Sequence, residues 1–545
     1  MRTKGNHNIL YLVALYPDSK FPFMGESLGI CAIAGYLQGK YDDSLSVRLF
    51  DQQRDNDDRI ISHILADRPA IIGISIKVFS FSKFVQFYGL LRSEVFPYYT
   101  PLVVIGNSVA HFSGESILTE YGFHDVIVSL GEGEVSFDGL YQYVCGGIKL
   151  EDVNNIMYFQ DGSIRRSVFH YLDKSEIPIA DRTFTQDFYN KDGEIYMESS
   201  RGCAYCSCNI CECRYFLGAT NPTYRWRDKP IGKVIEELLM LEGLGVKAVN
   251  FSDEDFIGPD TYGIDRTIEL AETVITKGID ISFRINARVK SLFSQNDTHE
   301  LALKKIEMLK SLKRAGLVKL FLGFESGVQS QIDRYGKGYK LQEFIIAKSI
   351  LDELEIEYEL GYISIDPLMS LEELHESLLF IKEEGCIPYI SSIYKELRVQ
   401  KGNRSYFRRL RQYEQQNGIS LVGDVLFDEQ RYDIIGYADN RIATIVSLMK
   451  DYIDENYKKY YELRRMTQYD ENHSKDNSYS IMEKLRYNDY DLLLGLTRSL
   501  MKGKSLSVQR EIVDKYRHFR DDVLNVSSGF NGYFDSEDID FTLIK

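Results

Sequence analysis

The stretch ESSRGCAYCSCNICECRYFLG, residues Glu198–Gly218, places five of the eight cysteines of the chain within eleven residues. Thiols at this density are typical of a soft metal centre and not of core packing. The candidates are a zinc site, an iron–sulfur cluster and a disulfide-linked loop. The stretch therefore predicts the chemical centre of the protein.

The spacing of the cysteines separates these candidates. A zinc ribbon needs two Cys-x-x-Cys pairs about 15–20 residues apart, whereas the pairs Cys203/Cys206 and Cys208/Cys211 nearly touch. Disulfide frameworks are typical of small secreted domains, and nothing else in this sequence indicates secretion. An iron–sulfur cluster accepts thiolates from several directions, so that a short loop can bind it. The spacing favours a cluster, with zinc as the alternative.

The residues around the first cysteine resemble the radical S-adenosylmethionine (SAM) enzymes, specifically their cobalamin-binding branch. These enzymes commonly carry Glu-x-x-Arg-Gly-Cys followed by the spacing Cys-x3-Cys-x2-Cys. The opening is matched by Glu198, Arg201, Gly202 and Cys203. The resemblance implies a [4Fe–4S] cluster held by three cysteines, with one iron left open for the amino and carboxylate groups of SAM.

The remaining spacing departs from the family pattern. Counting from Cys203, the usual ligand positions are Ser207 and Ile210, which cannot bind iron. One inserted residue restores the match, giving Cys203-x4-Cys208-x2-Cys211. These three cysteines are the predicted cluster ligands and the predicted catalytic centre.

Two cysteines of the stretch remain outside this triplet. Cys206 and Cys213 are then spare thiols, and a cluster that uses Cys206 in place of one of the three stays an alternative. The roles of both thiols are left open by the sequence.

Composition bounds the class of protein. The 545 residues carry a formal charge of −16 at a pI near 5.2, with 44% hydrophobic residues, which predicts three or four globular domains and argues against a nucleic-acid groove. No apolar run approaches the roughly 18–20 residues of a membrane span. The run Ile9–Tyr16 has eight residues and no cleavage site after it, so a buried strand is favoured over a signal peptide. A cytoplasmic location is expected.

Short apolar runs alternate with helical patterns from residue 9 to about residue 147. This alternation predicts a Rossmann-like, doubly wound parallel sheet of about five strands in an α/β domain spanning residues 1–148. Ligands bind such a sheet beyond the carboxyl ends of its strands. The segments MGESLG, IGIS, VIGNS and LGEGE resemble, in order, the landmarks of cobalamin-binding domains, although ordinary strand-end glycines are the alternative. The predicted cobalamin contacts are Gly73, Ser75, Gly106, Asn107, Ser108, Gly131, Glu132 and Gly133.

The lower face of the cobalamin is expected to receive no histidine from the protein. The chain contains no Asp-x-His-x-x-Gly, the setting of the lower-ligand histidine in cobalamin mutases and methionine synthase. His111 follows the Gly106 turn, and polar packing near the cofactor is its expected role.

The next two parts are a connector and a barrel. Residues 149–193 are interpreted as a connector that contains a hairpin at Asp161-Gly162. Residues 194–397 show six βα units, which predict a partial (β/α)6 barrel with its active site at the carboxyl ends of the strands. Polar strand-end residues are expected to converge there: Asp253, Asp255, Arg284, Asn286, Glu325, Ser326 and Asp366.

Some of these residues carry a more specific expectation. Gly323–Gly327 resembles the Gly-x-Glu-Ser-Gly signature of radical SAM proteins, which implies that Glu325 and Ser326 contact SAM, and Tyr205 is placed near its adenine. Asp253 and Arg284 are also expected to contact a cofactor. The alternative is that Asp253 and Asp255 cap the following segment and that Arg284 bridges to them.

Residues 398–545 are interpreted as a mainly helical region with an acidic tail, DSEDIDFTLIK. It carries no readable motif. A role in shaping the substrate pocket is expected, and a partner-binding module is the alternative.

The resemblance implies a cobalamin-dependent radical SAM enzyme, most often in this branch a class B methyltransferase that methylates an unactivated carbon with two SAM per turnover. Its cofactors are the cluster, SAM and methylcobalamin. A natural-product or peptide substrate and an electron donor such as flavodoxin or ferredoxin are the expected partners. The alternatives are rearrangement or cyclisation without methyl transfer, and a zinc-stabilised interaction protein.

Overall fold

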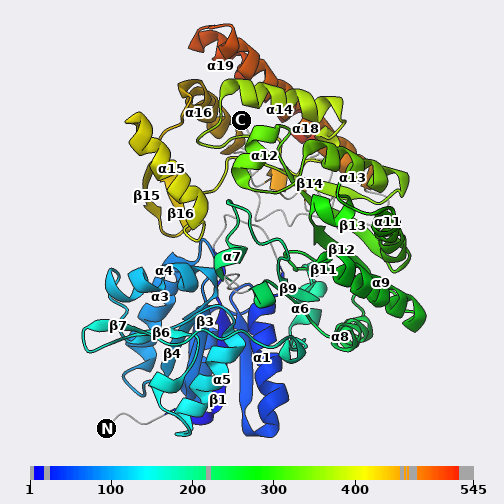
Figure 1. Ribbon diagram of the computed structural model, residues 1–545. Coiled ribbons are helices and arrows are strands. Elements are labelled where there is room, and N and C mark those ends of the chain that lie inside the picture. Colours follow the sequence, from blue (N-terminus) through cyan, green and yellow to red (C-terminus); the bar gives the residue numbers. More distant parts are fainter. Residues whose placement is uncertain are drawn as a thin grey trace.

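The computed structural model describes residues 5–17, 25–216, 222–454, 459–461, 463–464 and 475–526. Figure 1 shows an N-terminal α/β domain at the lower left, a half-barrel of strands and helices at the right, and a C-terminal region above. The cysteine stretch lies between the first two parts. The acidic C-terminal tail lies outside the described residues.

The N-terminal domain is built on one seven-stranded sheet in the order β2-β1-β3-β4-β5-β6-β7. The first five strands are parallel, as predicted. These strands read as continuous apolar runs because helices cover both faces. The bounds are β1 (Asn6–Ala14), β2 (Ser46–Asp51), β3 (Pro69–Ser75), β4 (Leu102–Gly106), β5 (Val126–Ser129), β6 (Ile156–Gln160) and β7 (Ser163–Arg166).

The hairpin expected in the connector is present, but it belongs to the N-terminal sheet. β6 pairs antiparallel with β5 and with β7. Its turn residues Asp161 and Gly162 have φ of 50° and 74°, as a type I′ turn requires. The N-terminal domain therefore extends beyond the expected boundary at residue 148, and the connector begins after β7.

Helices cover the two faces of this sheet separately. Leu10 and Leu12 of β1 pack with α1 and α5, whereas Tyr11 and Val13 pack with α2, α3 and α4. Alternate residues of a strand point to opposite faces, so one strand serves both cores. The bounds are α1 (Leu28–Tyr41), α2 (Asp57–Asp67), α3 (Phe81–Leu90), α4 (Asn107–Thr119), α5 (Gly133–Val144) and, in the connector, α6 (Thr185–Tyr189).

The second part is a parallel sheet in the order β14-β13-β12-β11-β8. Helices follow the strands on its outer face, as the βα repeat predicts (Figure 1). The strands are β8 (Tyr196–Met197), β11 (Ala248–Phe251), β12 (Ser282–Ala287), β13 (Leu317–Glu325) and β14 (Tyr358–Tyr362). The helices are α8 (Ile231–Gly243), α9 (Asp260–Lys277), α10 (Val289–Leu292), α11 (His299–Arg314), α12 (Gln329–Tyr335), α13 (Leu341–Glu353) and α14 (Leu371–Glu383).

The sixth predicted strand, residues 390–397, is only partly formed. It contributes two isolated parallel bridges, Leu360 with Ile390 and Ile365 with Glu396. Between them the backbone N–H of Lys395 donates to the Ser364 hydroxyl at 2.9 Å and not to a carbonyl. This side-chain contact interrupts the ladder, so the barrel has five regular strands and an irregular sixth segment.

The cysteine stretch has a local frame that the sequence did not reveal. β9 (Ser200–Gly202) pairs antiparallel with β10 (Trp226–Asp228), and α7 (Cys213–Phe216) follows the cysteines. Each of these elements is too short to show a hydrophobic period. The β9–β10 hairpin thus joins the residues before the cysteines to those that follow the cysteine loop.

The C-terminal region is mainly helical but contains one hairpin. Its elements are α15 (Arg404–Asn417), β15 (Val422–Leu426), β16 (Arg431–Ile434), α16 (Asn440–Asp454), α18 (Lys475–Met501) and α19 (Leu506–Val526). The turn between β15 and β16 reaches the N-terminal domain, where Asp428 accepts hydrogen bonds from the backbone of Phe81 and Ser82 and Phe427 packs on Phe81. The C-terminal region thus spans both preceding domains.

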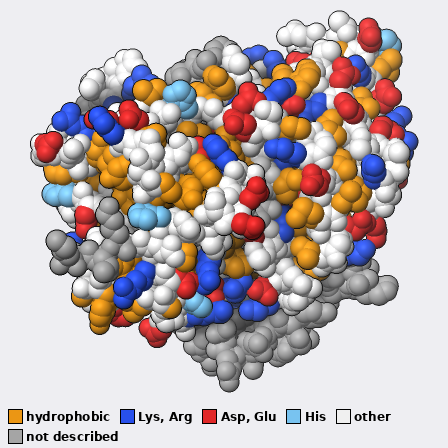
Figure 2. Space-filling view, turned by 90° about the horizontal axis from the view of Figure 1, so that it is seen from below, with side chains coloured by type: hydrophobic (Ala, Val, Ile, Leu, Met, Phe, Trp, Pro, Cys, Tyr) orange, Lys and Arg blue, Asp and Glu red, His pale blue; other side chains and the backbone are white. Residues whose placement is uncertain are grey.

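Acidic and basic side chains are interspersed over the face seen in Figure 2. Hydrophobic side chains lie between them on the same face. Within the described part of the chain, no helix combines the length and the apolar composition needed to cross a bilayer.

Candidate active site

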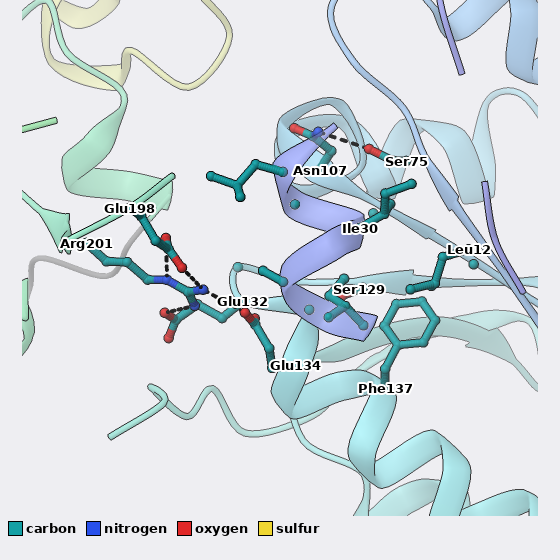
Figure 3. Close-up of a pocket in the computed structure, with 18 of the residues that line it drawn as sticks. Leu12, Ile30, Ser75, Asn107, Ser129, Glu132, Glu134, Phe137, Glu198 and Arg201 are labelled. Atoms are coloured by element: carbon teal, nitrogen blue, oxygen red, sulfur yellow. Dashed lines mark hydrogen bonds and ion pairs between the residues drawn. The ribbon is translucent and has the colours of Figure 1, made fainter. Parts of the chain in front are cut away.

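A cavity of about 460 Å³ lies between the N-terminal sheet and the cysteine stretch. Figure 3 shows its lining: strand ends of the N-terminal domain on one side, and Glu198 and Arg201 on the other. The predicted cobalamin contacts Gly73, Ser75, Gly106, Asn107, Gly131, Glu132 and Gly133 all line it. These residues lie at or just after the carboxyl ends of β3, β4 and β5, where a doubly wound sheet binds its ligand.

Ser108 is the exception among these predicted contacts and is not among the lining residues. Its backbone N–H donates to Oδ1 of Asn107 at 2.6 Å. Asn107 itself adopts φ of 78° and donates from Nδ2 to the Ser75 hydroxyl at 3.1 Å. The positive φ turns Asn107 over the cavity, and Ser108 supports it.

The glycines at the cavity serve different purposes. A Cβ atom on Gly73 would stand 2.4 Å from the Phe137 ring, so this glycine permits packing inside the domain. At Gly106 the nearest atom to such a Cβ is Cβ of Ser129 at 3.7 Å. Of these two glycines, only Gly106 has free space beside its backbone that a ligand could occupy.

His111 has the packing role that its position predicts. Its Nδ1 accepts a hydrogen bond from the backbone N–H of Gly131 at 3.0 Å, and its ring packs on Phe216 of α7. His111 therefore supports the Gly131 turn at the rim of the cavity.

A buried charge cluster joins the two sides of the cavity. Arg201 binds Glu132 at 2.9 Å, Glu134 at 2.7 Å and Glu198 at 2.6 Å, and Arg227 binds Glu132 at 2.9 Å. The side chain of Glu132 is 3% exposed. Its carboxylate is thus engaged by guanidinium groups of the second domain, which makes Glu132 a link between the domains, and its contact with cobalamin stays a prediction.

Glu254 also lines the cavity and was not singled out from the sequence. Its Oε2 accepts the backbone N–H of Gly202 at 3.0 Å, and burial raises the pKa of its carboxyl to about 7. Glu254 lies in the run SDEDF, where no hydrophobic periodicity distinguishes it from its acidic neighbours.

The five clustered thiols fall into two groups. Cys206 and Cys213 are buried and pack together, whereas Cys203 and Cys208 are partly exposed and Cys211 is exposed. The accessible set is the predicted triplet. No three His, Cys, Asp or Glu side chains in the described ranges are grouped closely enough to hold a single metal ion.

The thiols also differ in acidity. Burial and the nearby Asp255 carboxylate raise the pKa of Cys203 to about 12. A hydrogen bond with the Cys213 thiol lowers the pKa of Cys211 to about 7. A bound metal would itself deprotonate its thiol ligands.

Two contacts fix the cysteine loop over the barrel. The backbone N–H of Asn209 donates to the Tyr335 carbonyl at 2.7 Å, and the Tyr205 hydroxyl donates to the Gly336 carbonyl at 2.9 Å. A Cβ atom on Gly338 would stand 2.4 Å from that hydroxyl oxygen, so a glycine is required there. Tyr205 is thus an anchor of the loop.

Asp255 orders the first cysteine. Its Oδ2 accepts the backbone N–H of Ala204 at 3.1 Å and lies 3.7 Å from Sγ of Cys203. Arg288 pairs with the same oxygen at 2.7 Å. The arginine that bridges to the acidic pair is therefore Arg288, and not Arg284 as considered from the sequence.

Asp253 and Arg284 do not converge as expected. Asp253 is 1% exposed, and its oxygens accept hydrogen bonds from Ser199 and Ser200, so it holds the turn before the cysteines. Arg284 pairs in register with Lys319 of β13 on the inner face of the barrel. The βα repeat was predicted from the sequence, but the direction of each side chain depends on contacts that the sequence does not show.

Glu325 lies at the carboxyl end of β13, as predicted. It pairs with Lys337 at 3.0 Å, and although burial opposes the charge, Lys337 holds the pKa of Glu325 below its usual value. Its φ of 69° is rare for a residue other than glycine. Strain of this kind is typical of functional sites.

Ser326 and Asp366 serve the fold instead. Ser326 is fully buried and donates to Gln331. Asp366 is fully buried too, and it accepts from Arg334 at 2.9 Å and from Tyr406 of α15 at 2.8 Å. The polar side-chain atoms of Ser326 and Asp366 thus face partners inside the protein, and the contact of Ser326 with SAM stays a prediction.

The fold was compared with solved structures. OxsB, described as a cobalamin-dependent SAM radical enzyme with aqua-cobalamin and SAM bound, matches 97% of this chain and 82% of its own at a TM-score of 0.85 and 22% identity. TsrM from Kitasatospora setae is described as a radical SAM methyltransferase with cobalamin and a [4Fe–4S] cluster bound. It matches 78% of this chain and 81% of its own, at a TM-score of 0.55 and 13% identity. The fold is that of the cobalamin-binding radical SAM enzymes.

Three known proteins are similar in sequence to this chain. The 4′-phospho-dehydrooxetanocin synthase of Priestia megaterium is 26% identical over 388 residues, 69% of this chain and 51% of the relative. An uncharacterised methyltransferase of Pyrococcus horikoshii is 25% identical over 366 residues, which are 66% of this chain and 73% of the relative. The anaerobic magnesium-protoporphyrin IX monomethyl ester cyclase of Rubrivivax gelatinosus is 25% identical over 355 residues, which are 61% of this chain and 58% of the relative. No family model matches the chain.

Proposed function

We propose that the protein is a cobalamin-dependent radical SAM enzyme that methylates an unactivated carbon of a small-molecule or peptide substrate. The observation that carries this proposal is the cavity shared by the strand ends of the N-terminal domain and the segment that leads into the cysteines. Arg201, which lines this cavity, lies two residues before Cys203 in the chain. The chain spans about half the length of the synthase relative, so its activity is inferred from this geometry.

The residues present fit the three cofactors. The open backbone at Gly106 and the polar rim of Ser75 and Asn107 suit cobalamin. The three accessible thiols suit a [4Fe–4S] cluster, and the pair Glu325 with Lys337 lies near Cys208, as the mutual electrostatic effects of these groups indicate. When bound, the cluster with SAM would supply a 5′-deoxyadenosyl radical, and cobalamin would supply a methyl group.

The protein's own residues position these groups. Arg201 holds the Glu132 and Glu134 turn against the segment before Cys203, which sets the separation of the two cofactor sites. The barrel would hold the substrate carbon between them and exclude water. A reduced flavodoxin or ferredoxin is proposed as the electron donor.

The cluster ligands are tested by iron content. Alanine variants of the five clustered cysteines are reconstituted anaerobically, and iron and SAM cleavage are measured. Loss of both is expected for Cys203, Cys208 and Cys211, with retention for Cys206 and Cys213. Retention in Cys208→Ala with loss in Cys206→Ala would contradict the proposed triplet.

The reaction is tested with SAM labelled in its methyl group and with candidate substrates. Methyl transfer predicts one labelled methyl in the product, with 5′-deoxyadenosine and S-adenosylhomocysteine in roughly equal amounts. The cyclase among the relatives favours a second candidate, cyclisation or rearrangement. Turnover with deoxyadenosine, without S-adenosylhomocysteine and without label, would establish that second candidate.

A further inference from the structure

Three consecutive carboxylates after β11 hold the backbone on both sides of Cys203. Each accepts one backbone N–H group of the segment at 3.0 to 3.1 Å: Asp253 from Ser199, Glu254 from Gly202 and Asp255 from Ala204. The segment that leads into and past the first cysteine is therefore positioned by one acidic run, residues 253–255.

Glu254 differs from its two neighbours in what lies on its other side. Asp253 and Asp255 are 1% and 0% exposed, so their carboxylates serve the protein interior alone. Glu254 keeps accessible surface and lines the cavity between the two domains. One carboxylate of the run is thus available to a ligand in that cavity.

The charge of Glu254 is not neutralised by a cation. The other carboxylates of the cavity are bound by Arg201, as Figure 3 shows: Glu132, Glu134 and Glu198. Within the described ranges, no Lys or Arg pairs with Glu254, which accepts from the Gly202 backbone. Desolvation, together with the charges of Asp253 and Glu198, raises the pKa of its carboxyl to about 7. A hydrogen-bond donor on a bound ligand would favour the charged form.

The same carboxylate is close to the cysteine loop. Gly202, whose N–H it accepts, directly precedes Cys203. The charge of Glu254 also acts on the thiols of Cys211 and Cys213, so its carboxylate is within electrostatic reach of both. Glu254 therefore faces the cavity on one side and the predicted cluster ligands on the other.

We propose that Glu254 is a positioning residue that couples the two cofactor sites. Its carboxylate accepts a hydrogen bond from a primary carboxamide of the corrin rim while it holds the Gly202 N–H before Cys203. Cobalamin in the cavity then orders the segment that carries the cluster. The inference rests on the proposed function, because it describes how that one site is regulated. Such coupling is reciprocal, so the cluster tightens cobalamin binding by the same factor.

The test compares the Kd of hydroxocobalamin in cluster-free and cluster-loaded protein. Both forms of the full chain are prepared anaerobically, and binding is measured by equilibrium dialysis. The wild type is expected to bind cobalamin at least about fivefold more tightly with the cluster present. Glu254→Ala removes both contacts and should bring this ratio to about one. Glu254→Gln keeps an acceptor for the Gly202 N–H and should give an intermediate ratio.

Two matched variants separate coupling from binding alone. Asn107→Gly removes a polar group from the opposite wall of the cavity, and glycine accepts the φ of 78° at this position. It should weaken cobalamin binding equally in both forms and leave the ratio unchanged. Glu236→Ala removes an exposed carboxylate of α8 and should behave as the wild type.

A spectroscopic readout separates positioning from a general effect on stability. The paramagnetic resonance signal of the reduced cluster is recorded with and without saturating cobalamin. Cobalamin should shift this signal in the wild type and in Asn107→Gly, and shift it less in Glu254→Ala. A Kd ratio of about one in the wild type, or the same ratio and the same shift in the wild type and Glu254→Ala, would overturn the proposal.

The proposed function can fail separately from this coupling. Deoxyadenosine formation from SAM is measured on the same preparations. If SAM is not cleaved while the Kd ratio depends on Glu254, the radical function fails and the positioning role stands. If SAM is cleaved while the wild-type ratio is about one, the positioning role fails and the radical function stands. A wild type that takes up no iron or binds no cobalamin would overturn both.

Discussion

Glu325 shows how a single residue combines strain and charge. A non-glycine residue at φ of 69° costs of order 1–3 kcal/mol, and this conformation directs the carboxylate to Lys337 at 3.0 Å. The geometry therefore favours a role in binding.

The variant Glu325→Gln is expected to bind SAM about tenfold more weakly or worse, while cluster and cobalamin content stay unchanged. The reason is that the amide loses the negative charge at the barrel mouth. Equilibrium dialysis with labelled SAM gives the affinity, and Glu353→Gln, an exposed site, is the control. An unchanged SAM affinity would return Glu325 to a structural role.

At the scale of elements, the regular part of the fold could be predicted because its signals are local. Parallel strands buried on both faces read as apolar runs, and helices such as α9 end at a glycine in the left-handed conformation, Gly278 with φ of 67°. Elements that depend on distant partners could not be predicted. β9 and β10 have three residues each, and the sixth strand is interrupted where Ser364 accepts the N–H of Lys395.

The candidate site divides in the same way. The motifs located the cavity residues of the N-terminal domain and the thiol stretch, because turn glycines and ligand spacings are sequence features. The partners of individual side chains were not predictable. Arg288 and not Arg284 reaches Asp255, because Arg288 directly follows the carboxyl end of β12, whereas Arg284 lies within that strand.

The β15–β16 turn is held on the N-terminal domain by a cap together with aromatic packing of Phe427 on Phe81. Asp428 accepts the backbone N–H groups at the start of α3, at 2.8 and 3.3 Å. Loss of such a cap costs about 1 kcal/mol, so Asp428→Ala should raise the open population of the hairpin about fivefold. Limited proteolysis at the turn measures this, with Asp424→Ala of β15 as the control. Equal cleavage rates in both variants and the wild type would show that the cap does not hold the hairpin.

At the scale of the whole molecule, two buried ionic clusters join the N-terminal domain to the barrel. One is the Arg201 cluster at the cavity. The other brings Arg182 of the connector between Glu26 and Glu237, with Lys229 also on Glu237. Buried charges are costly unless they are paired, so such clusters favour one arrangement of the domains over others. That arrangement brings the two sides of the shared cavity together.

The variant Arg201→Met is expected to weaken cobalamin binding more than it weakens SAM binding. Removing one partner of a buried ion pair typically costs 3–5 kcal/mol, and here it leaves Glu132 and Glu134 without the cation that holds their turn against the barrel. The lost free energy opposes closure of the cavity, which cobalamin would have to restore on binding. Wild-type protein at a hundredfold excess of cobalamin over its Kd should gain about 2.7 kcal/mol of stability.

The variant should gain less at the same cobalamin concentration, because its Kd is higher. Denaturant unfolding with and without cobalamin measures the gain, and equilibrium dialysis measures the Kd directly. Arg92→Met, at a side chain 63% exposed, is the control for loss of an arginine. Arg201→Lys keeps a charge but not the fork that reaches three carboxylates, so its affinity should fall between those of the wild type and Arg201→Met. Equal cobalamin affinity in all four proteins would mean that the ionic cluster fixes the fold without setting the cofactor cavity.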